Sequence, residues 1–462
     1  MPEIASRRRN GRSNLVVSTP YRENSIVAIA SAASAAGVLE RFYTTLYLAG
    51  WDKLARWLPV VGTHLAAELG RRAYPGIPSE RIQSVAMLPE LAHVGSRRLF
   101  GKQRPNLAAE RMYGVKARFD RGVARRLRGQ GVDALVAMYG AAQESFRAIK
   151  FQGGLAVLNF VNSHPAEHNR YLAELAHLKP PHHELIPERV ARRVDVELAL
   201  ADLVLVPSQF VAAQLISHGV SERKIGLLPY GVDLRAFHPP AHRESTKRPL
   251  ECLYVGQISQ RKGTRILLDA ARRCRDLPVR FRLIGPIVSA EVLNDPPDNV
   301  CYEGVALPGG VAAAMRQADF FALPSIEDAC ALVVLEAMAT GLPVITTTNN
   351  GSGEVIQDTM DGLIVPAGDA GRLAEAIRRL VEQPDLRRQL GEAALRKVQD
   401  AHSWDTYSRS VLSAIDGRAH SFQGGGGKPS ALTPPTHPTG LLIEANDHDA
   451  QRPRAPTGRR GN

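Results

Sequence analysis

The sequence predicts an α/β protein with two doubly wound parallel sheets, and three observations support this. Short β-rich runs alternate with helical patterns, which is the order that gives parallel strands joined by crossover helices. These runs are apolar nearly throughout, as expected of strands covered by helices on both faces. The chain has 462 residues, 44% of them hydrophobic and 23% charged, which suits two domains better than one core.

The first sheet is expected to contain, in chain order, the runs SIVAIA, DALVAMYG, LAVLNFV, ADLVLVPS and KIGLLPY. The first of these begins SIVAIASAASAAGVL, from Ser25 to Leu39. That segment is too short to span a bilayer, and its small residues resemble a strand and turn more than a signal-peptide core.

The four cysteines form no CxxC pair, which favours a reducing compartment over a disulfide scaffold. We therefore expect a cytoplasmic protein.

The second sheet is expected at LECLYVG, VRFRLIG, ADFFALPS, LPVITT and GLIVP. A polar stretch with three prolines, His238–Glu251, separates it from the first. The predicted division is a disordered basic N-terminus at 1–13, a first domain at 14–240, a second at 241–416 and a disordered tail at 417–462. The last helix of the second domain could pack back on the first. Since ligands of such sheets bind beyond the carboxyl ends of the strands, we expect a cleft between the domains.

The formal charge of +12 is concentrated at the ends of the chain, because residues 1–13 and 418–462 each contribute +3. Low-complexity basic ends are typical of solvated disorder, and no nucleic-acid partner is expected. A helix with arginines at helical spacing is predicted over Arg111–Arg128. It is either a solvated face with snorkelling side chains or a dock for an anionic membrane surface or acidic acceptor. The second interpretation would place the protein at the inner face of the membrane.

The stretch PSIEDACALVVLEAMATGLPVIT, from Pro324 to Thr346, carries three acids between two predicted strands. Ser325 followed by Asp328 resembles a capping box for the helix that follows. Glu336 lies among apolar residues of that helix, where carboxylates without partners are rare. On one helix the two acids would be about 12 Å apart, beyond the roughly 5–9.5 Å of a glycosidase pair. They could instead grip an elongated ligand such as a nucleotide sugar, with its phosphates at the helix N-terminus.

The run YVGQISQRKG predicts a strand that ends in a turn with cations. Gly256 permits a tight turn, and Arg261 and Lys262 precede the next helix. Cations at a strand-to-helix turn suit a diphosphate leaving group.

These segments occur in a familiar order. ADLVLVPSQFVAAQLISHGVSERKIGLLPYGVDLRAF, VGQISQRKG, ALPSIEDACALVVLEAMATGLPVITTTNNGSGEVI and DGLIVPAGDAGRLAEAIRRLV cover about residues 195–415. Together they resemble family 4 of the retaining glycosyltransferases, which have the GT-B architecture of two Rossmann-like domains facing across a cleft. The first half resembles this family in outline only.

The resemblance implies a donor site in the second domain. Lys262 matches the lysine that contacts the donor diphosphate, and Gln257 stands where the family usually has arginine, a charge that Arg261 could replace. Asp328 and Glu336 match the acids that bind the donor sugar and the ribose, with Glu327 a substitute for Asp328 if the loop shifts. Ala329-Cys330-Ala331 replaces the usual Gly-Phe-Gly.

The same resemblance completes the predicted site. His164 matches a histidine near the reacting sugar carbon, so His164, Asp328 and Lys262 are the candidate catalytic residues. The candidate donor-binding residues are Gly37, Gly256, Gln257, Arg261, Lys262, Glu327, Asp328, Leu332 and Glu336. The implied activity is retaining transfer of a hexosyl group from a nucleotide-diphosphate sugar to a glycan, lipid-linked or small-molecule hydroxyl. No cofactor or metal is expected.

Two other functions stay open. His164, Glu167 and His168 spell H-x-x-E-H, an inverted zinc-protease motif, with Glu184 among the acids available as a further ligand. The Ala-Cys-Ala replacement instead suits an inactive scaffold that binds nucleotide sugars.

Overall fold

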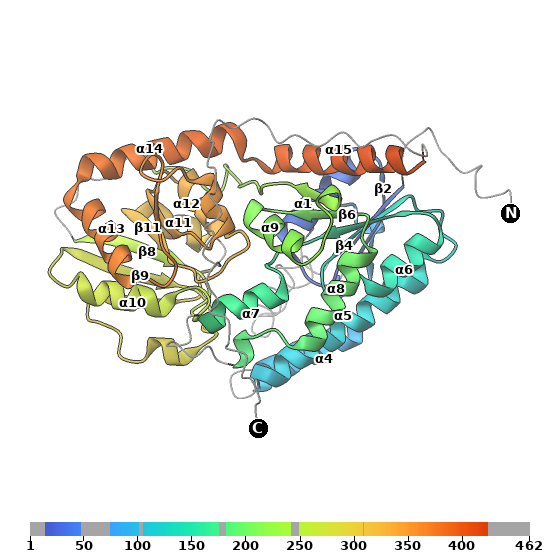
Figure 1. Cartoon of the computed structure of the whole chain (residues 1–462), viewed down its shortest axis with the longest axis horizontal. Coiled ribbons are helices and arrows are strands. Elements are labelled where there is room, and N and C mark those ends of the chain that lie inside the picture. Colours follow the sequence, from blue (N-terminus) through green and yellow to red (C-terminus); the bar gives the residue numbers. More distant parts are fainter. Residues whose placement is uncertain are drawn as a thin grey trace, which may run out of the picture. The chain divides into compact units, whose positions relative to one another are not determined.

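The structure, a computed structural model, describes residues 14–47, 74–100, 105–174, 182–241, 249–307 and 309–423. The predicted fold class is confirmed, because the described residues form two parallel sheets with helices around them (Figure 1). Both sheets belong to one compact unit, 1–430.

The first sheet has seven parallel strands in the order β3-β2-β1-β4-β5-β6-β7. The order reverses between β1 and β4. The strands are β1 (Leu15–Thr19), β2 (Leu39–Thr44), β3 (Ile82–Ser84), β4 (Ala134–Met138), β5 (Leu155–Asn159), β6 (Leu203–Val206) and β7 (Ile225–Leu227). The helices of this half are α1 (Asn24–Ala35), α4 (Met87–Phe100), α5 (Pro105–Leu127), α6 (Gln143–Phe151), α7 (Pro165–Glu174), α8 (Glu188–Leu200) and α9 (Gln209–Ser217), with short 3₁₀ turns at η2 (Ser79–Arg81), η4 (His182–Glu184) and η5 (Glu222–Lys224).

The second sheet has six parallel strands in the order β10-β9-β8-β11-β12-β13 and reverses between β8 and β11. The strands are β8 (Leu250–Val255), β9 (Val279–Ile284), β10 (Val300–Gly304), β11 (Phe320–Leu323), β12 (Val344–Thr347) and β13 (Leu363–Val365). The helices are α10 (Thr264–Arg273), α11 (Gly310–Gln317), α12 (Leu332–Ala339), α13 (Ala370–Glu382), α14 (Pro384–Ala401) and α15 (Trp404–Gln423), with 3₁₀ turns at η6 (Ala290–Leu293) and η7 (Gly351–Val355).

The prediction of a strand at SIVAIA is wrong, because these residues lie in α1. The first strand is β1, just before it. Glu23 caps α1 by accepting a hydrogen bond from the backbone N–H of Ile26 at 3.1 Å. A short run of small apolar residues suits a buried helix as well as a buried strand, so periodicity could not separate the two.

Three further strands have no counterpart in the prediction, namely β2, β3 and β10. β3 and β10 are edge strands, and each is only partly covered. β2 carries Glu40 and Arg41 near its start. Strands with exposed or charged positions lack the continuous apolar run that revealed the others.

The ends of the chain differ from the prediction at one place. Residues 417–423 were expected in a disordered tail, but they continue α15. Residues 1–13 and 424–462 lie outside the described residues, as do 242–248 within the predicted join, so the predicted domain boundaries stay predictions. α15 lies beside α1, and Ser408 Oγ donates to the carbonyl of Ala28 at 3.3 Å (Figure 1).

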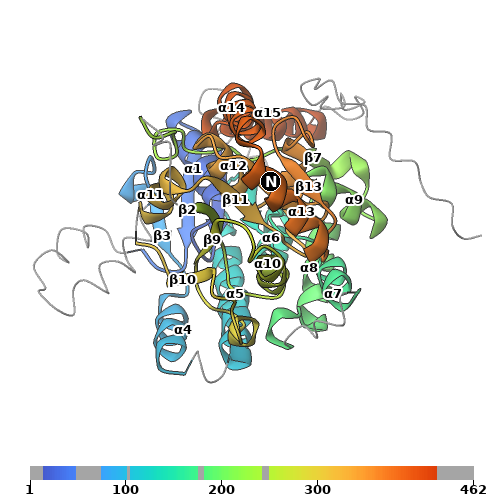
Figure 2. The ribbon, with the colours of Figure 1, turned by 90° about the vertical axis from the view of Figure 1, so that its left-hand side faces the viewer.

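The predicted arginine-bearing helix is confirmed as the greater part of α5. Val115, Phe119 and Leu127 on this helix are buried, whereas Arg118 and Arg121 are exposed. Figures 1 and 2 show α4 beside α5.

No helix in the described ranges is both long and apolar enough to cross a bilayer. All four cysteines are free thiols.

Candidate active site

The second sheet reverses its strand order between β8 and β11, and ligands of doubly wound sheets bind at such a switch point, beyond the carboxyl ends of the strands. Two loops meet there. Residues 256–263 connect β8 to α10, and residues 324–331 connect β11 to α12. These loops hold most of the residues of the predicted donor site.

Gly263 brings the two loops together. It precedes α10 with a φ of +69°, and a Cβ at this position would lie 1.8 Å from the carbonyl oxygen of Pro324. Only glycine tolerates both this left-handed conformation and this close approach. The N–H of Ile326 also donates to the carbonyl of Arg261 at 2.9 Å. The predicted turn with cations is therefore fastened to the loop that carries the acids.

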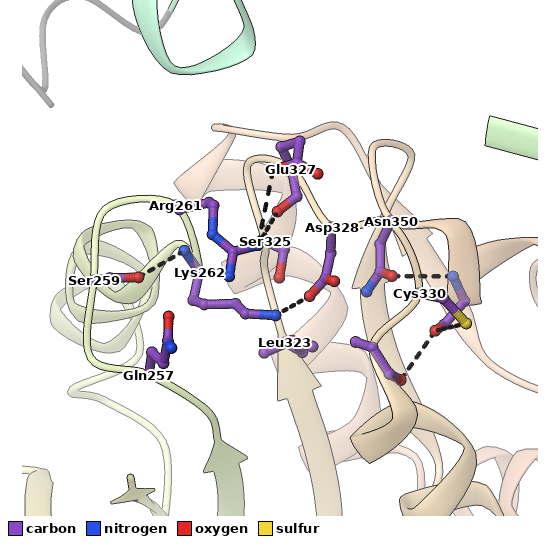
Figure 3. Close-up of polar contacts among 12 residues, drawn as sticks. Gln257, Ser259, Arg261, Lys262, Leu323, Ser325, Glu327, Asp328, Cys330 and Asn350 are labelled. Atoms are coloured by element: carbon purple, nitrogen blue, oxygen red, sulfur yellow. Dashed lines mark hydrogen bonds and ion pairs between the residues drawn. The ribbon is translucent and has the colours of Figure 1, made fainter. Parts of the chain in front are cut away.

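Gly256 does not make the tight turn that the sequence predicts for it. Its N–H continues the sheet by donating to the carbonyl of Ile284 at 2.9 Å, and the left-handed glycine of this loop is Gly263. Gln257, labelled in Figure 3, follows with an exposed side chain. Its carbonyl accepts a hydrogen bond from the Tyr254 hydroxyl at 2.6 Å.

Lys262 is directed at the second loop. Figure 3 shows its side chain pointing at Asp328, with which it forms an ion pair. Its backbone N–H donates to Ser259 Oγ at 3.2 Å. Burial lowers the pKa of Lys262, and the Asp328 carboxylate opposes this effect. Because an ammonium has three N–H donors, Lys262 can stay paired with Asp328 and also donate a hydrogen bond to a phosphate oxygen.

Glu327 has partners on both halves of the chain. Arg261 Nη1 lies 3.8 Å from Glu327 Oε2, His168 Nδ1 lies 2.9 Å from the same oxygen, and Ser163 Oγ donates to Oε1. Burial would raise the pKa of Glu327, but His168 and Arg261 bring it down to about 2. Glu327 and Asp328 therefore have different partners, and the loop shift by which Glu327 would replace Asp328 is not the arrangement observed.

Glu184, which lies in the first half of the chain, binds the backbone of the turn that contains Arg261 and Lys262. The N–H groups of Gln260 and Arg261 donate to its carboxylate at 2.9 and 2.8 Å. Burial would lower the pKa of Arg261, but the carboxylates of Glu327, Asp328 and Glu184 raise it. Arg261 is therefore a permanent cation at the switch point.

The capping role predicted for Ser325 and Asp328 is wrong. α12 begins at Leu332, and its N-cap, Ala331, makes no side-chain cap. Asp328 lies in the loop, where its N–H donates to the carbonyl of Asn349 and its carbonyl accepts from Gly351, both at 2.9 Å. The separation of Asp328 and Glu336 is consequently not that of eight helical residues, on which the estimate from the sequence depended.

The Ala329-Cys330-Ala331 segment is held by hydroxyl groups. Ser208 Oγ donates to the carbonyl of Ala329 at 2.8 Å, and Ser352 Oγ to that of Ala331 at 2.9 Å. A Cβ on Gly351 would lie 1.9 Å from the Ala329 carbonyl oxygen. The Ala329-Cys330-Ala331 segment, which stands where the family usually has Gly-Phe-Gly, is thus fixed by hydrogen bonds and by close packing against Gly351.

Glu336 lies on α12, one turn beyond the partly buried Leu332. Within the described part of the chain its carboxylate makes no hydrogen bond or ion pair. Burial raises its pKa to about 7. A carboxylate that is partly withdrawn from water and has no protein partner is available for a ligand.

Two predicted site residues lie elsewhere. Gly37, with a φ of +72°, follows α1 and precedes β2, at the edge where the strands begin. The prediction for Gly37 is wrong because SIVAIA is a helix and not the strand before a ligand loop. His164 stacks on His218 with ring centroids 3.8 Å apart, and its Nε2 lies 3.0 Å from Asp195 Oδ1. Its ring is packed against α8 and α9, and His164 does not line the cavity described below.

The geometry does not suit the zinc motif. His168 uses both ring nitrogens, since Nδ1 contacts Glu327 and Nε2 lies 2.9 Å from the carbonyl oxygen of Glu184. Glu167 is bound to Arg170 and His218. The described ranges contain no group of three or more His, Cys, Asp or Glu side chains placed to hold a metal ion.

A cavity of about 670 Å³ opens beside this site. Arg261 and Glu327 line it from the second half, and His168, Glu184, Lys116 and Tyr139 are among those that line it from the first. Sequence reasoning assigned no ligand role to Lys116 or Tyr139. They come from α5 and the loop after β4, far apart in the chain, and no motif links them.

A known protein family matches part of the second half of the chain. Residues 249–383 match the profile of the family described as "Glycosyl transferases group 1". This part of the chain is therefore similar to the group 1 glycosyltransferases. The matched residues include the switch point of the second sheet, the turn of Arg261 and Lys262, and the three acids Glu327, Asp328 and Glu336.

Curated proteins of similar sequence have the names of different glycosyltransferases. The chain is 27% identical to a D-inositol 3-phosphate glycosyltransferase of Thermobifida fusca, over 51% of this chain and 59% of that protein. It is 31% identical to the putative colanic acid biosynthesis glycosyltransferase WcaL of Escherichia coli, over 38% and 47%. The chain thus spans about half the length of the curated relatives it matches.

Two solved structures share the fold. Sucrose-phosphate synthase from Thermosynechococcus elongatus is 19% identical, with a TM-score of 0.61 over 88% of this chain and 98% of that one. Anabaena Alr3699/HepE, solved with UDP and glucose, is 14% identical, with a TM-score of 0.59 over 88% and 100%. The chain therefore shares the two-sheet GT-B fold of these structures along most of its length.

Proposed function

We propose that this protein transfers a sugar from a nucleoside-diphosphate sugar to an acceptor hydroxyl, with retention of anomeric configuration. One arrangement carries the proposal: Arg261 and Lys262 stand at the switch point of the second sheet, and Glu336 nearby on α12 has a carboxylate without a partner in the described residues. The cations suit a diphosphate, and a free carboxylate suits the paired hydroxyls of a ribose.

To catalyse this transfer, the enzyme must stabilise the negative charge that develops on the departing diphosphate. Lys262 and Arg261 would stabilise that charge from fixed positions, which lowers the barrier because they need no rearrangement during the reaction. Asp328 orients Lys262 through their ion pair and would accept a hydrogen bond from a sugar hydroxyl beside it. We assign no nucleophile. Since these cations can balance the diphosphate, we propose that turnover requires no metal.

The acceptor would occupy the cavity of about 670 Å³ in the first half, next to Arg261 and Glu327. A glycan or lipid-linked hydroxyl entering there would meet the donor at the site of the leaving group. Exclusion of water from the closed site would limit hydrolysis of the donor.

The test is a panel of nucleoside-diphosphate sugars with several bases and sugars. UDP-glucose is the first choice, because HepE was solved with UDP and glucose. Binding is measured by calorimetry, and release of nucleoside diphosphate is measured with and without lipid and glycan extracts. Matched reactions contain EDTA. Turnover that survives EDTA supports the proposal, and failure to bind any donor refutes it. Binding of a donor without any turnover would instead identify a nucleotide-sugar-binding scaffold.

We also propose that α4 and α5 meet an anionic membrane surface. A groove of about 450 Å³ between them is lined by Arg118, Arg121 and Arg125. On α4, Leu88 and Leu91 are 76% and 48% exposed. Apolar side chains beside exposed arginines fit lipid tails and acidic headgroups respectively. This surface would bring a lipid-linked acceptor to the enzyme.

A further inference from the structure

Lys116 lies at the switch point of the first sheet, the counterpart of the place where Lys262 lies in the second. Tyr21 follows β1 and Tyr139 follows β4, and these two strands flank the reversal of strand order. The ammonium of Lys116 lies 5.1 Å from the ring centroid of Tyr21 and 5.2 Å from that of Tyr139. A Cβ on Gly140 would lie 3.4 Å from its Nζ. The side chain therefore turns inward and lines the cavity.

The ammonium of Lys116 makes neither a hydrogen bond nor an ion pair with any described residue. Its two aromatic neighbours offer only cation–π contacts, which are weaker than a charged hydrogen bond. Burial lowers the pKa of Lys116 to about 8, with Glu197 opposing this effect. In most molecules at neutral pH the side chain is thus a cation that is partly withdrawn from water and touches no counter-ion in the described part of the chain.

The acids and cations around Lys116 already have partners. Glu197 accepts from the N–H groups of Gly140 and Ala142, and from Arg193 Nε at 3.1 Å. Arg193 also donates to Asp120. These contacts hold the loop after β4 and occupy the carboxylates of Glu197 and Asp120, so that neither pairs with Lys116.

The remaining charged groups that line the cavity are also engaged. Arg189 pairs with Glu110, Glu184 accepts from the cationic turn, and Glu327 contacts His168 and Arg261. The cavity therefore contains one ammonium that no charged group of the described chain contacts, at a position where acceptors are proposed to bind.

We propose that Lys116 selects an acceptor that carries an anionic group, a carboxylate or a phosphate ester, on a sugar or other polyol. The anion replaces the missing counter-ion of Lys116, and the Tyr139 ring, which also lines the cavity, offers a flat apolar face to a sugar ring. That the bound anion is a sugar acceptor rests on the proposed function. Binding of the anion by Lys116 can be measured separately from sugar transfer.

The diphosphate of the donor is a less suitable occupant. Lys262 and Arg261 already stand at the second switch point, and Lys262 does not line this cavity. A role for Lys116 in donor binding is one outcome that the test distinguishes.

The test measures binding first, without donor. The full chain and Lys116→Met are titrated by calorimetry with matched pairs: glucose 6-phosphate and glucose, glucuronate and glucose, and myo-inositol 1-phosphate and myo-inositol. Vesicles of phosphatidylinositol mixed with phosphatidylcholine form the lipid arm, compared with phosphatidylcholine alone. A preference for the soluble anions identifies a free acceptor, and a preference for the phosphatidylinositol vesicles alone, lost in Lys116→Met, identifies a lipid headgroup.

We expect wild type to prefer the anionic member of at least one pair by about 10-fold or more, and Lys116→Met to remove that preference. Lys116→Gln serves as a second variant if the first folds poorly. Lys150→Met is the matched control, because Lys150 pairs with Asp202 away from the cavity. Equal binding of the charged and neutral members by wild type would overturn the inference, as would a preference that survives in both Lys116 variants.

The proposed function has its own readout. Binding of the donor should be unchanged in Lys116→Met. If wild type binds no donor but binds the anionic probes through Lys116, the transferase proposal fails and the anion site stands. If donor affinity falls about 10-fold in Lys116→Met while the anionic probes are ignored, Lys116 serves the donor and the inference about the acceptor is refuted.

Discussion

Glu336→Gln is expected to stabilise the ligand-free protein and to weaken its hold on nucleotide. The free carboxyl has a pKa raised from 4.5 to about 7 by burial. An acid with a raised pKa in the folded state loses stability as pH rises from its unfolded pKa to its folded one. The cost is absent well below pH 4.5 and complete well above pH 7. Glutamine has nearly the same shape and never ionises, so it avoids this cost.

The magnitude follows from the shift. A change from 4.5 to about 7 corresponds to about 3 kcal/mol of preference for the neutral form. Since the side chain is only partly buried, solvent screening reduces this, and we expect a gain of roughly 1–3 kcal/mol at pH 8.5. For a domain of this size that is a rise in Tm of about 2–4 °C per kcal/mol. At pH 5 the gain should be less than a third as large, because the unfolded chain is then only partly ionised.

The assay is thermal unfolding followed by circular dichroism at pH 5 and pH 8.5, for wild type, Glu336→Gln and the control Glu375→Gln. Glu375 is an exposed acid on α13 whose pairing with Arg372 should be worth little. Calorimetry with the nucleoside diphosphate of the preferred donor should show binding weakened by about 10–100-fold in Glu336→Gln, since charged hydrogen bonds to the ribose are lost.

Two results would refute this reasoning. A Tm gain that is absent, or equal at the two pH values, would mean that the Glu336 carboxyl is not desolvated in the free protein. Unchanged nucleotide affinity would mean that the carboxylate is not a ligand, and that its isolation on α12 has another cause.

Three further outcomes are expected. Lys262→Ala should lower turnover more than Arg261→Ala, because the lysine has protons free for the diphosphate; equal losses in steady-state assays would show that the diphosphate is shared between them. Glu327→Gln should cost about 2–4 kcal/mol in urea unfolding at pH 7, because it leaves buried partners on both halves unsatisfied. With a folded pKa of about 2, this contribution is present above pH 4.5 and fades as pH falls toward 2, so a cost that already disappears at pH 6 would contradict the assignment. Replacement of Arg118 and Arg121 by glutamate should reduce cosedimentation with phosphatidylglycerol vesicles, and added salt should reduce it for wild type; binding that depends on neither would exclude an electrostatic surface.

The site could be predicted in part. The turn of Arg261 and Lys262 was found because it follows an apolar strand directly, and such local order is read from the sequence. Glu336 was found because a carboxylate among apolar helical residues is unusual. The assignment of Ser325 and Asp328 as a helix cap failed because the loop before α12 is held by Asn349 and Gly351, which no local pattern reveals.

The sequence by itself determined the alternation of strands and helices, the parallel sheets and the position of the cationic turn, since these depend on the spacing of apolar residues and on neighbours along the chain. The tertiary structure alone decided which charges have partners. Glu327 contacts His168, and Glu184 contacts the turn of Arg261 and Lys262. Among the described residues, Lys116 contacts two aromatic rings and no acid. Such contacts join residues far apart in sequence, and their energies depend on burial and distance, which exist only once the sheets have brought these side chains together.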